Sequence, residues 1–285
     1  MNPLFHVAAF TSDPAGGNMA GVVIGKHGAP AEMMAIAAEV GYPETAFLEP
    51  TEDPSVWRTR YFAPEAEVDF CGHATIGAGS ILGLRFGPGL YMLQTNVGEI
   101  PVEVAIDADD GVQVTLTSIA PSRGVLTDAA FAAALGALRY STDDLDPTFP
   151  PAVANAGVNH LMVPLRDRAT LASLDYDFDV LKILMERENW TTVNCFVRTD
   201  DNEFHARNPF PVGGIVEDPA TGAAAAAFGG YLALHNLIDV PATVQVFQGY
   251  DMGSPSQINV VVPADPGSGI RVTGSAVVVG EPFVG

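Results

Sequence analysis

The chain has 285 residues, of which 48 % are hydrophobic, and its formal net charge is −21. That length predicts two domains, and so negative a surface argues against nucleic acid or an anionic membrane as a partner. No apolar run reaches the roughly 18 residues of a membrane span, the N-terminus lacks a secretory pattern, and two cysteines are too few for a disulfide scaffold. We therefore expect a cytoplasmic protein.

Predicted strands outnumber predicted helices along the chain. Runs that alternate in polarity or are rich in β-branched residues predict strands at 5–10, 21–24, 56–62, 100–106, 112–117, 160–164, 193–198, 243–248, 257–262 and 270–279. Helices are expected at 31–40, 75–84, 128–138, 179–188 and 221–234. Because no βαβ rhythm is sustained, we expect antiparallel sheet curled around a central helix, twice over.

A repeat within the chain supports this doubling. Two segments share an arginine, a proline and a turn residue at the same spacing, 147 residues apart: Arg60, Pro64 and Cys71, then Arg207, Pro211 and Asp218. Each segment has an extended lead-in followed by a helix of small residues. The repeat predicts an α+β protein with two pseudo-symmetric lobes, residues 1–118 and 119–272, and an active site in the cleft between them.

The first turn of the repeat places an acid, a thiol, a glycine and an imidazole together, in the stretch 68–77 that contains Cys71, Gly72 and His73. The start of a helix offers free backbone N–H groups, which suit an anion. A lone histidine there is more often structural than catalytic, and a free cysteine is often inert packing. The matching turn at Asp218 shifts the balance toward a shared site.

Three further segments are candidates for chemistry. The glycine-rich loop 10–18, which ends in Asn18, is by itself best interpreted as a plain turn. Glu44 follows a proline and is either an exposed strand start or a carboxylate in a dry pocket, where it would suit proton transfer. Asp218 and Thr221 could cap the helix that follows them, a role compatible with catalysis.

Several motifs, in order along nearly the whole chain, resemble those of the phenazine-biosynthesis-like isomerase/epimerase family. They are Asp13-Pro14-x-Gly-Gly-Asn18, Pro43-Glu44-Thr45-Ala46-Phe47, Arg60-Tyr61-Phe62-x-Pro64, the stretch from Glu67 to Thr75, Phe204-His205-Ala206-Arg207, Glu217-Asp218-Pro219-Ala220-Thr221-Gly222 and Gln248-Gly249-x-x-Met252-Gly253. Each is weak alone, and together in order they are specific. The resemblance implies the fold of diaminopimelate epimerase, with the last strand, about 273–285, returning to the first lobe.

The resemblance also implies roles for individual residues. Glu44 matches the family's acid/base, and His73 and Asp218 match its assisting pair. The remaining matches are to groups that bind the substrate and its carboxylate: Asn18, Cys71, Gly72, Thr221, Gly222 and Ala223. A small anionic carboxylate substrate, a homodimer, no metal and no organic cofactor are implied as well.

Some alternatives stay open. The family commonly has serine where this chain has Ala223, so a binding or regulatory protein without catalysis is one alternative. An amino-acid racemase is another, although Cys195 lies in a strand-like run and is expected in the core, which argues against a mechanism with two thiols. Arg60 and Arg207 either bind the anion or pair with nearby acids.

Overall fold

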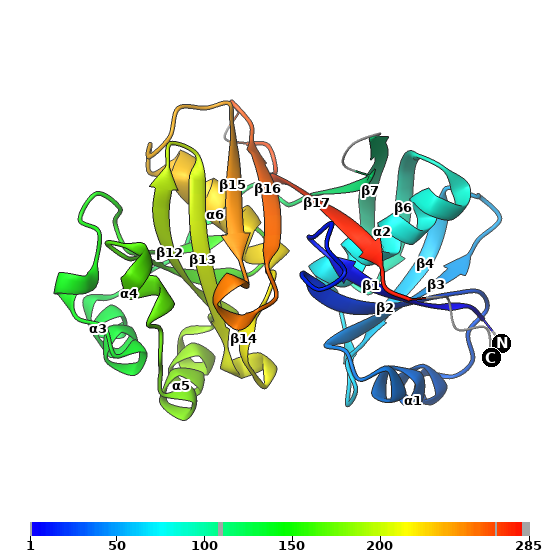
Figure 1. Cartoon of the computed structure of the whole chain (residues 1–285), viewed down its shortest axis with the longest axis horizontal. Coiled ribbons are helices and arrows are strands. Elements are labelled where there is room, and N and C mark those ends of the chain that lie inside the picture. The colour runs from blue at the N-terminus through cyan, green and yellow to red at the C-terminus, as the bar shows by residue number, and fades with distance from the viewer. Residues whose placement is uncertain (1, 108–110, 266, 281–285) are drawn as a thin grey trace. The chain divides into compact units, whose positions relative to one another are not determined.

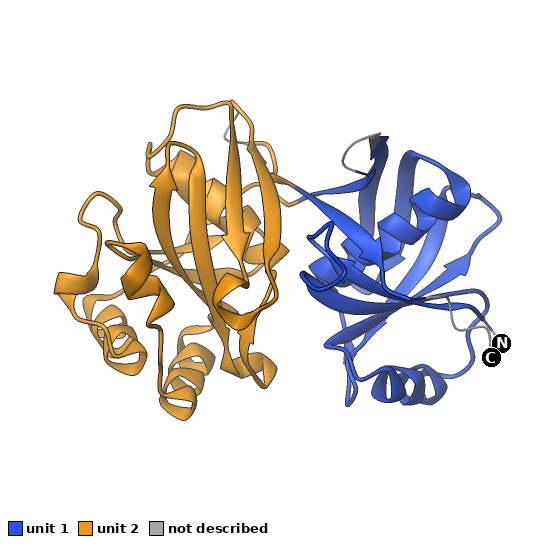
Figure 2. Cartoon of the chain, in the orientation of Figure 1, with its two compact units in different colours: residues 1–117, 273–285 blue, residues 118–272 orange. Residues whose placement is uncertain are grey.

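The computed structural model describes residues 2–107, 111–265 and 267–280. The chain divides into two compact units, Met1–Thr117 with Thr273–Gly285, and Ser118–Val272 (Figure 2). We call them unit 1 and unit 2. Among the described residues, no helix is long and apolar enough to cross a membrane.

Unit 1 is built on a closed barrel of eight strands. Its strands are β1 (Leu4–Ala9), β2 (Asn18–Ile24), β3 (Glu44–Pro50), β4 (Val56–Phe62), β6 (Gly89–Thr95), β7 (Gly98–Asp107), β8 (Gly111–Thr117) and β17 (Arg271–Val278), with the short β5 (Glu67–Val68) added beside β4. The last strand, β17 (red in Figure 1), closes the barrel because it pairs with both β1 and β8.

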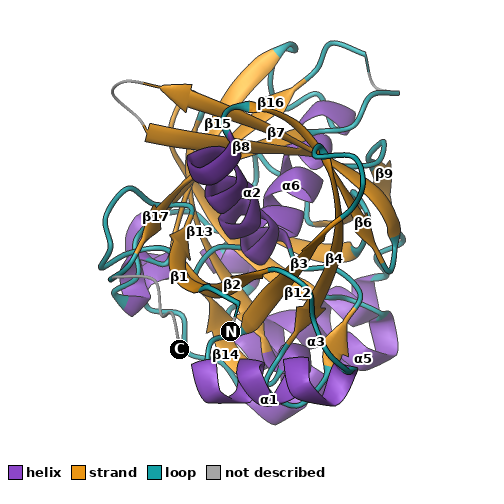
Figure 3. Cartoon of the chain, turned by 90° about the vertical axis from the view of Figure 1, so that its right-hand side faces the viewer, coloured by secondary structure: helices purple, strands orange, loops and turns teal. Residues whose placement is uncertain are grey.

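The helix α2 (Gly72–Phe86) lies inside this barrel, with residues 73–83 all buried (Figure 3). Small residues make this possible: a Cβ added to Gly79 would lie 2.6 Å from Val114 Cγ1 of β8. A larger side chain there would push the helix away from the sheet. The helix α1 (Pro30–Val40) instead covers the outside, where Met33 and Ala37 pack against Val23, Phe47 and Phe62.

Unit 2 repeats this plan around α6 (Gly222–Leu234). Its strands are β9 (Ser122–Arg123), β10 (Ala152–Asn155), β11 (Asn159–Pro164), β12 (Thr192–Asp200), β13 (Glu203–Phe210), β14 (Ile215–Asp218), β15 (Ala242–Gln248) and β16 (Ser256–Val262). Its other helices are α3 (Asp128–Leu138), α4 (Arg168–Ala172) and α5 (Phe178–Glu188), with 3-10 turns η1 (Thr142–Asp144), η2 (Pro211–Gly213) and η3 (Tyr250–Met252). Gly229 of α6 lies against Val260 of β16 in the way that Gly79 lies against Val114. A Cβ added to Gly229 would lie 2.6 Å from Val260 Cγ1.

The order of strand orientations is also the same in the two units. In unit 1, β2 is parallel to β3 and β4 is parallel to β6, with antiparallel pairs between them. In unit 2, β11 is parallel to β12 and β13 to β15 in the same alternation. The predicted fold class, two lobes each with a sheet around a central helix, is confirmed. The sheet of each unit also contains these two parallel pairs among the antiparallel ones that were expected.

Unit 2 also contains a buried chain of polar side chains across β11, β12 and β13. Thr192 Oγ1 donates to Asn208 Oδ1 at 2.8 Å, and Asn208 Nδ2 donates to Asn194 Oδ1 at 3.1 Å. Since the hydroxyl hydrogen of Thr192 is used, His160 Nδ1 donates to Thr192 Oγ1 at 2.8 Å. Complete burial lowers the pKa of His160 to about 3.

This buried histidine predicts a loss of stability in acid. The unfolded chain binds a proton at this ring below pH about 6.5, whereas the folded chain does not until pH about 3. The free energy of unfolding should therefore fall by about 1.4 kcal/mol per pH unit across that window. In His160→Asn, which keeps a donor for Thr192, this contribution to the slope should disappear. His235→Asn is the comparison, because burial lowers the pKa of that partly exposed ring by less, and its removal should change the slope less. Urea unfolding at pH 4 to 7 measures both, and equal slopes for wild type and His160→Asn would contradict the prediction.

Candidate active site

The side chains of Glu44, Cys71 and His73 meet in unit 1. Glu44 begins β3, and its Oε2 lies 3.3 Å from Cys71 Sγ and 3.4 Å from His73 Nε2. Cys71 Sγ in turn lies 3.3 Å from His73 Nδ1. The carboxylate side chain is 20 % exposed and the imidazole 7 %, so the three groups form a mostly buried cluster that solvent reaches from the Glu44 side.

The turn that holds Cys71 is fixed by buried hydroxyl groups. Cys71 is the N-cap of α2, in an extended conformation, and Thr75 Oγ1 donates to its carbonyl at 2.6 Å. The fully buried Tyr61 hydroxyl lies 2.6 Å from Thr75 Oγ1. These bonds connect β4 to the first turn of the helix and so hold Cys71 and His73 in place.

The first turn of α2 also provides backbone donors. The first intrahelical bond runs from the Thr75 N–H to the Cys71 carbonyl at 3.0 Å, so the N–H groups of Gly72 and His73 lie before the first intrahelical donor. A Cβ added to Gly72 would meet no atom within 4 Å, so there is open space beside this turn. An anionic group has room to approach these donors.

The glycine-rich loop before β2 forms the turn that the sequence predicted. Asp13 Oδ1 accepts the N–H of Ala15 at 2.9 Å, and the Asp13 carbonyl accepts the N–H of Gly16 at 2.9 Å. Asn18 begins β2 opposite Ala9 and is 1 % exposed. Its role toward a substrate stays a prediction.

The second turn, in unit 2, is built around Asp218 at the end of β14. Thr221 Oγ1 donates to Asp218 Oδ2 at 2.7 Å, and Thr221 is the N-cap of α6 without a side-chain cap bond. Thr221 thus lies at the N-cap position that the sequence suggested, while its hydroxyl group bonds to Asp218 and makes no cap bond to the helix. Both are buried.

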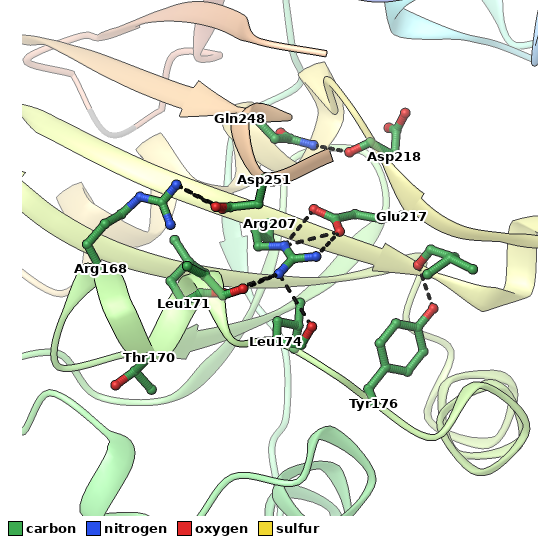
Figure 4. A network of polar contacts seen from close by, with 12 residues as sticks. Arg168, Thr170, Leu171, Leu174, Tyr176, Arg207, Glu217, Asp218, Gln248 and Asp251 are labelled. Atoms are coloured by element: carbon green, nitrogen blue, oxygen red, sulfur yellow. Dashed lines mark hydrogen bonds and ion pairs between the residues drawn. The ribbon is translucent and has the colours of Figure 1, made fainter. Parts of the chain in front are cut away.

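Gln248, at the end of β15, holds this second turn. Its Nε2 donates to the Asp218 carbonyl at 2.6 Å (Figure 4). The same Nε2 lies 2.9 Å from Thr221 Oγ1, and Oε1 accepts the Thr221 N–H at 3.2 Å. The next residue, Gly249, has φ +79°, and a Cβ there would lie 2.8 Å from the Pro219 carbonyl. In the sequence, Gln248 and Gly249 stand out only as a motif; a polar residue before a glycine at the end of a strand-like run was the available signal.

The two turns correspond less closely than the repeat suggested. At the level of the helices the offset is 150 residues, since α2 begins at Gly72 and α6 at Gly222. Thr221 therefore takes the N-cap place of Cys71, and the half-buried Ala223 takes the place of His73. Asp218 lies one turn earlier, so the aspartate and the thiol are not structural equivalents.

Arg60 and Arg207, the two arginines of the repeat, each form an ion pair with a glutamate. Of the two roles expected for them, this is pairing with a nearby acid. Arg207 Nη2 lies 2.6 Å from Glu217 Oε2, and its Nη1 donates to the carbonyls at the end of α4, including Ala172 at 3.1 Å (Figure 4). Arg60 Nε and Nη2 donate to both carboxylate oxygens of Glu67 at 2.7 and 2.5 Å. The sequence did not single out Glu217 as the partner of Arg207, because Glu217 lies next to Asp218 in the same motif.

Cys195 lies in β12 and is 0 % exposed, as expected for a core residue. Burial raises the pKa of its thiol. It packs in the apolar cluster that includes residues of α3 and α5. This argues against a mechanism with two facing thiols.

The arrangement in unit 1 combines a proton acceptor, a hydrogen-bonded imidazole and backbone donors for an anion. These are the parts needed to remove a proton from carbon and to stabilise the negative charge that results. The same three side chains are also a possible metal-ligand set, because one donor atom from each lies within 4.8 Å of the others.

Comparison with known proteins gives relatives that are named isomerases. The chain is 34 % identical over 285 residues to the "Uncharacterized isomerase YddE" of Escherichia coli K12, covering 96 % of this chain and 95 % of that one. It is 31 % identical over 257 residues to the trans-2,3-dihydro-3-hydroxyanthranilate isomerase of Pseudomonas aeruginosa, covering 88 % and 87 %.

Solved structures share the fold. A phenazine biosynthesis protein of the PhzF family from Bacillus anthracis matches with a TM-score of 0.86 and 26 % identity over 99 % of this chain and 98 % of that one. A probable proline racemase from Agrobacterium radiobacter matches at 15 % identity with a TM-score of 0.68, over 98 % and 92 %, which shows a shared fold alone. The family model "Phenazine biosynthesis-like protein" matches residues 7–282, and the chain belongs to this family, whose named relatives are isomerases.

Proposed function

We propose that this protein is an isomerase that moves a proton between carbons of a small carboxylate substrate without a metal or organic cofactor. Glu44 is the acid/base, and His73 and Asp218 assist. The observation that carries the proposal is the position of the Glu44 carboxylate, 3.3 Å from Cys71 Sγ and 3.4 Å from His73 Nε2 beside the start of α2.

The chemistry requires that the site stabilise a carbanion-like state. A proton on carbon next to a carboxylate is too weakly acidic for a glutamate in water. Backbone N–H groups at Gly72 and Gly222 would bind the substrate's carboxylate and the developing charge, each well-placed donor contributing a few kcal/mol. Because Arg60 and Arg207 pair with acids, the backbone donors carry most of this role.

His73 would serve to position and reset the base. Its Nε2 is close enough to Glu44 to share the proton that the carboxylate takes from carbon. The 20 % exposure of the Glu44 side chain lets that proton exchange with water before it returns to a different carbon. The isomerised product should therefore carry a hydrogen from solvent.

This predicts deuterium incorporation in D₂O. We would screen small carboxylates, including unsaturated and cyclic hydroxy acids, for ligands by thermal shift and then follow each ligand by NMR in D₂O. The expected result is a new isomer with solvent deuterium at the carbon that receives the proton. A ligand that binds tightly and shows neither isomerisation nor exchange would support the binding-protein alternative, for which Ala223 in place of serine is the motivating observation.

A further inference from the structure

The sequence Asp218-Pro219-Ala220-Thr221 is well suited to begin a helix with Asp218 as its cap. Aspartate is among the most favoured N-cap residues, and proline is favoured at the position directly after the cap. The helix α6 nevertheless begins only at Gly222, and its N-cap is Thr221, which makes no side-chain cap bond. A contact from elsewhere in unit 2 must therefore outweigh the local preference.

The helix α4 shows what the same pattern does when its aspartate caps. Asp167 is the N-cap of α4, and its Oδ1 accepts the N–H of Thr170 at 2.8 Å and the hydroxyl of Thr170 at 2.9 Å. Asp218 and Thr221 have the same spacing, and the Thr221 hydroxyl likewise donates to the carboxylate, at 2.7 Å. The N–H of Thr221 differs, because it donates to Gln248 Oε1 at 3.2 Å.

Gln248 receives this N–H from a fixed position at the end of β15. The residue is 1 % exposed, and its Nε2 donates both to the Asp218 carbonyl at 2.6 Å and to Thr221 Oγ1 at 2.9 Å. Thr221 Oγ1 therefore accepts from Gln248 and donates to Asp218, which holds it away from the start of α6. Gly249 allows this close approach, since a Cβ there would lie 2.8 Å from the Pro219 carbonyl.

We infer that Gln248 is a positioning residue for Asp218, which acts through Thr221 to keep the turn 218–221 out of the helix. If α6 began at Pro219, the Asp218 carboxylate would be committed to backbone N–H groups, as that of Asp167 is. The same capping would cover the helix start, whose N–H groups suit the carboxylate of a substrate. The effect on turnover rests on the proposed function, whereas the role of Gln248 in holding the turn does not.

The turn is tested on the free protein by NMR. In the wild type, Thr221 has φ −112° and ψ 87°, so its Cα and Cβ chemical shifts should be those of a non-helical residue. Gln248→Met keeps an unbranched side chain of similar length and removes every hydrogen bond to the turn. The shifts of residues 219–221 should then become helical. Unchanged shifts in Gln248→Met would overturn the inference.

Turnover is measured with a carboxylate that the wild type isomerises in D₂O. Gln248→Met should lower kcat about 100-fold through misplacement of Asp218. Its KM should rise about 10-fold, because the helix start loses hydrogen bonds to a charged group.

Thr221→Val gives a second measurement that leaves Gln248 in place. This variant removes only the hydroxyl that orients Asp218, so kcat should fall about 10-fold while KM stays within about 2-fold of the wild type. Thr221→Ser keeps the hydroxyl and should restore kcat. A purely structural role would give no such separation of kcat from KM.

Thr170→Val is the matched control, because it removes the hydroxyl from the other aspartate–threonine pair of the same spacing and should leave kcat and KM unchanged. Helical shifts in Gln248→Met with unchanged kcat would overturn the positioning role, as would equal kcat in Thr221→Val and the wild type. If the wild type isomerises none of the carboxylates tested, the proposed function is contradicted, and the chemical shifts still decide whether Gln248 holds the turn.

Discussion

Replacing Glu44 by glutamine is expected to lower kcat for isomerisation by about 10²- to 10⁴-fold, the usual contribution of a general acid/base. Glutamine keeps the shape and the hydrogen bonds of the side chain but cannot accept a proton from carbon. Substrate affinity should change little, since the carboxylate-binding donors at the helix starts are untouched. NMR of deuterium incorporation and a direct measurement of Kd separate the two quantities.

Glu49→Gln is the matched control, because it makes the same change near the other end of β3, where Glu49 lies opposite Arg58. Its turnover should stay close to that of the wild type. Exchange that persists in Glu44→Gln and is lost in Cys71→Ser would instead identify a thiol-dependent racemase. A Glu44→Gln variant with unchanged turnover would remove Glu44 from the mechanism.

The elements that could be predicted from sequence are those with a strong local signal. The small residues of α2 and α6 mark helices that strands approach closely, and Gly79 and Gly229 show why, each lying against a valine of the sheet. The turn before α2 was found because unlike functional groups stand together within three residues. Local patterns of this kind can be read from sequence because they depend on one helix or strand and on the elements packed directly against it.

What the sequence did not reveal depends on pairs of residues that are far apart in the chain. The parallel pairs β2–β3 and β13–β15 join strands separated by a helix. The direction in which one strand runs relative to its partner could not be read from the residues of either strand. The contact of Gln248 with Asp218 spans 30 residues. The spacing of 147 residues also aligned Asp218 with Cys71, whereas the helices begin 150 residues apart and make Thr221 the equivalent of Cys71.

The pairing of Arg207 with Glu217 gives the second large expected effect. The side chains are 13 % and 4 % exposed, and the guanidinium also donates to carbonyls at and after the end of α4 (Figure 4). Arg207→Met would leave Glu217 buried without its partner, which typically costs about 3–5 kcal/mol. Urea unfolding should show this loss.

Arg60→Met is the control, since Arg60 holds the same position in the repeat and makes a bidentate pair with Glu67. That pair is 28 % and 27 % exposed, so its removal should cost about 1 kcal/mol or less. Equal costs for the two variants would show that burial does not distinguish the pairs. The comparison is sharp because residue type, substitution and strand position are shared.

A double variant separates the loss of the pair from the loss of packing. In Arg207→Met with Glu217→Leu, no charge is left buried, and replacement of a buried ion pair by apolar residues is often neutral. Much of the stability lost in Arg207→Met should then return. Turnover need not return with it, because Glu217 directly precedes Asp218 in β14 and the pair fixes that strand against β13 and α4. Recovered stability with depressed kcat would identify the pair as a positioning element for Asp218, whereas full recovery of both would limit it to holding the fold.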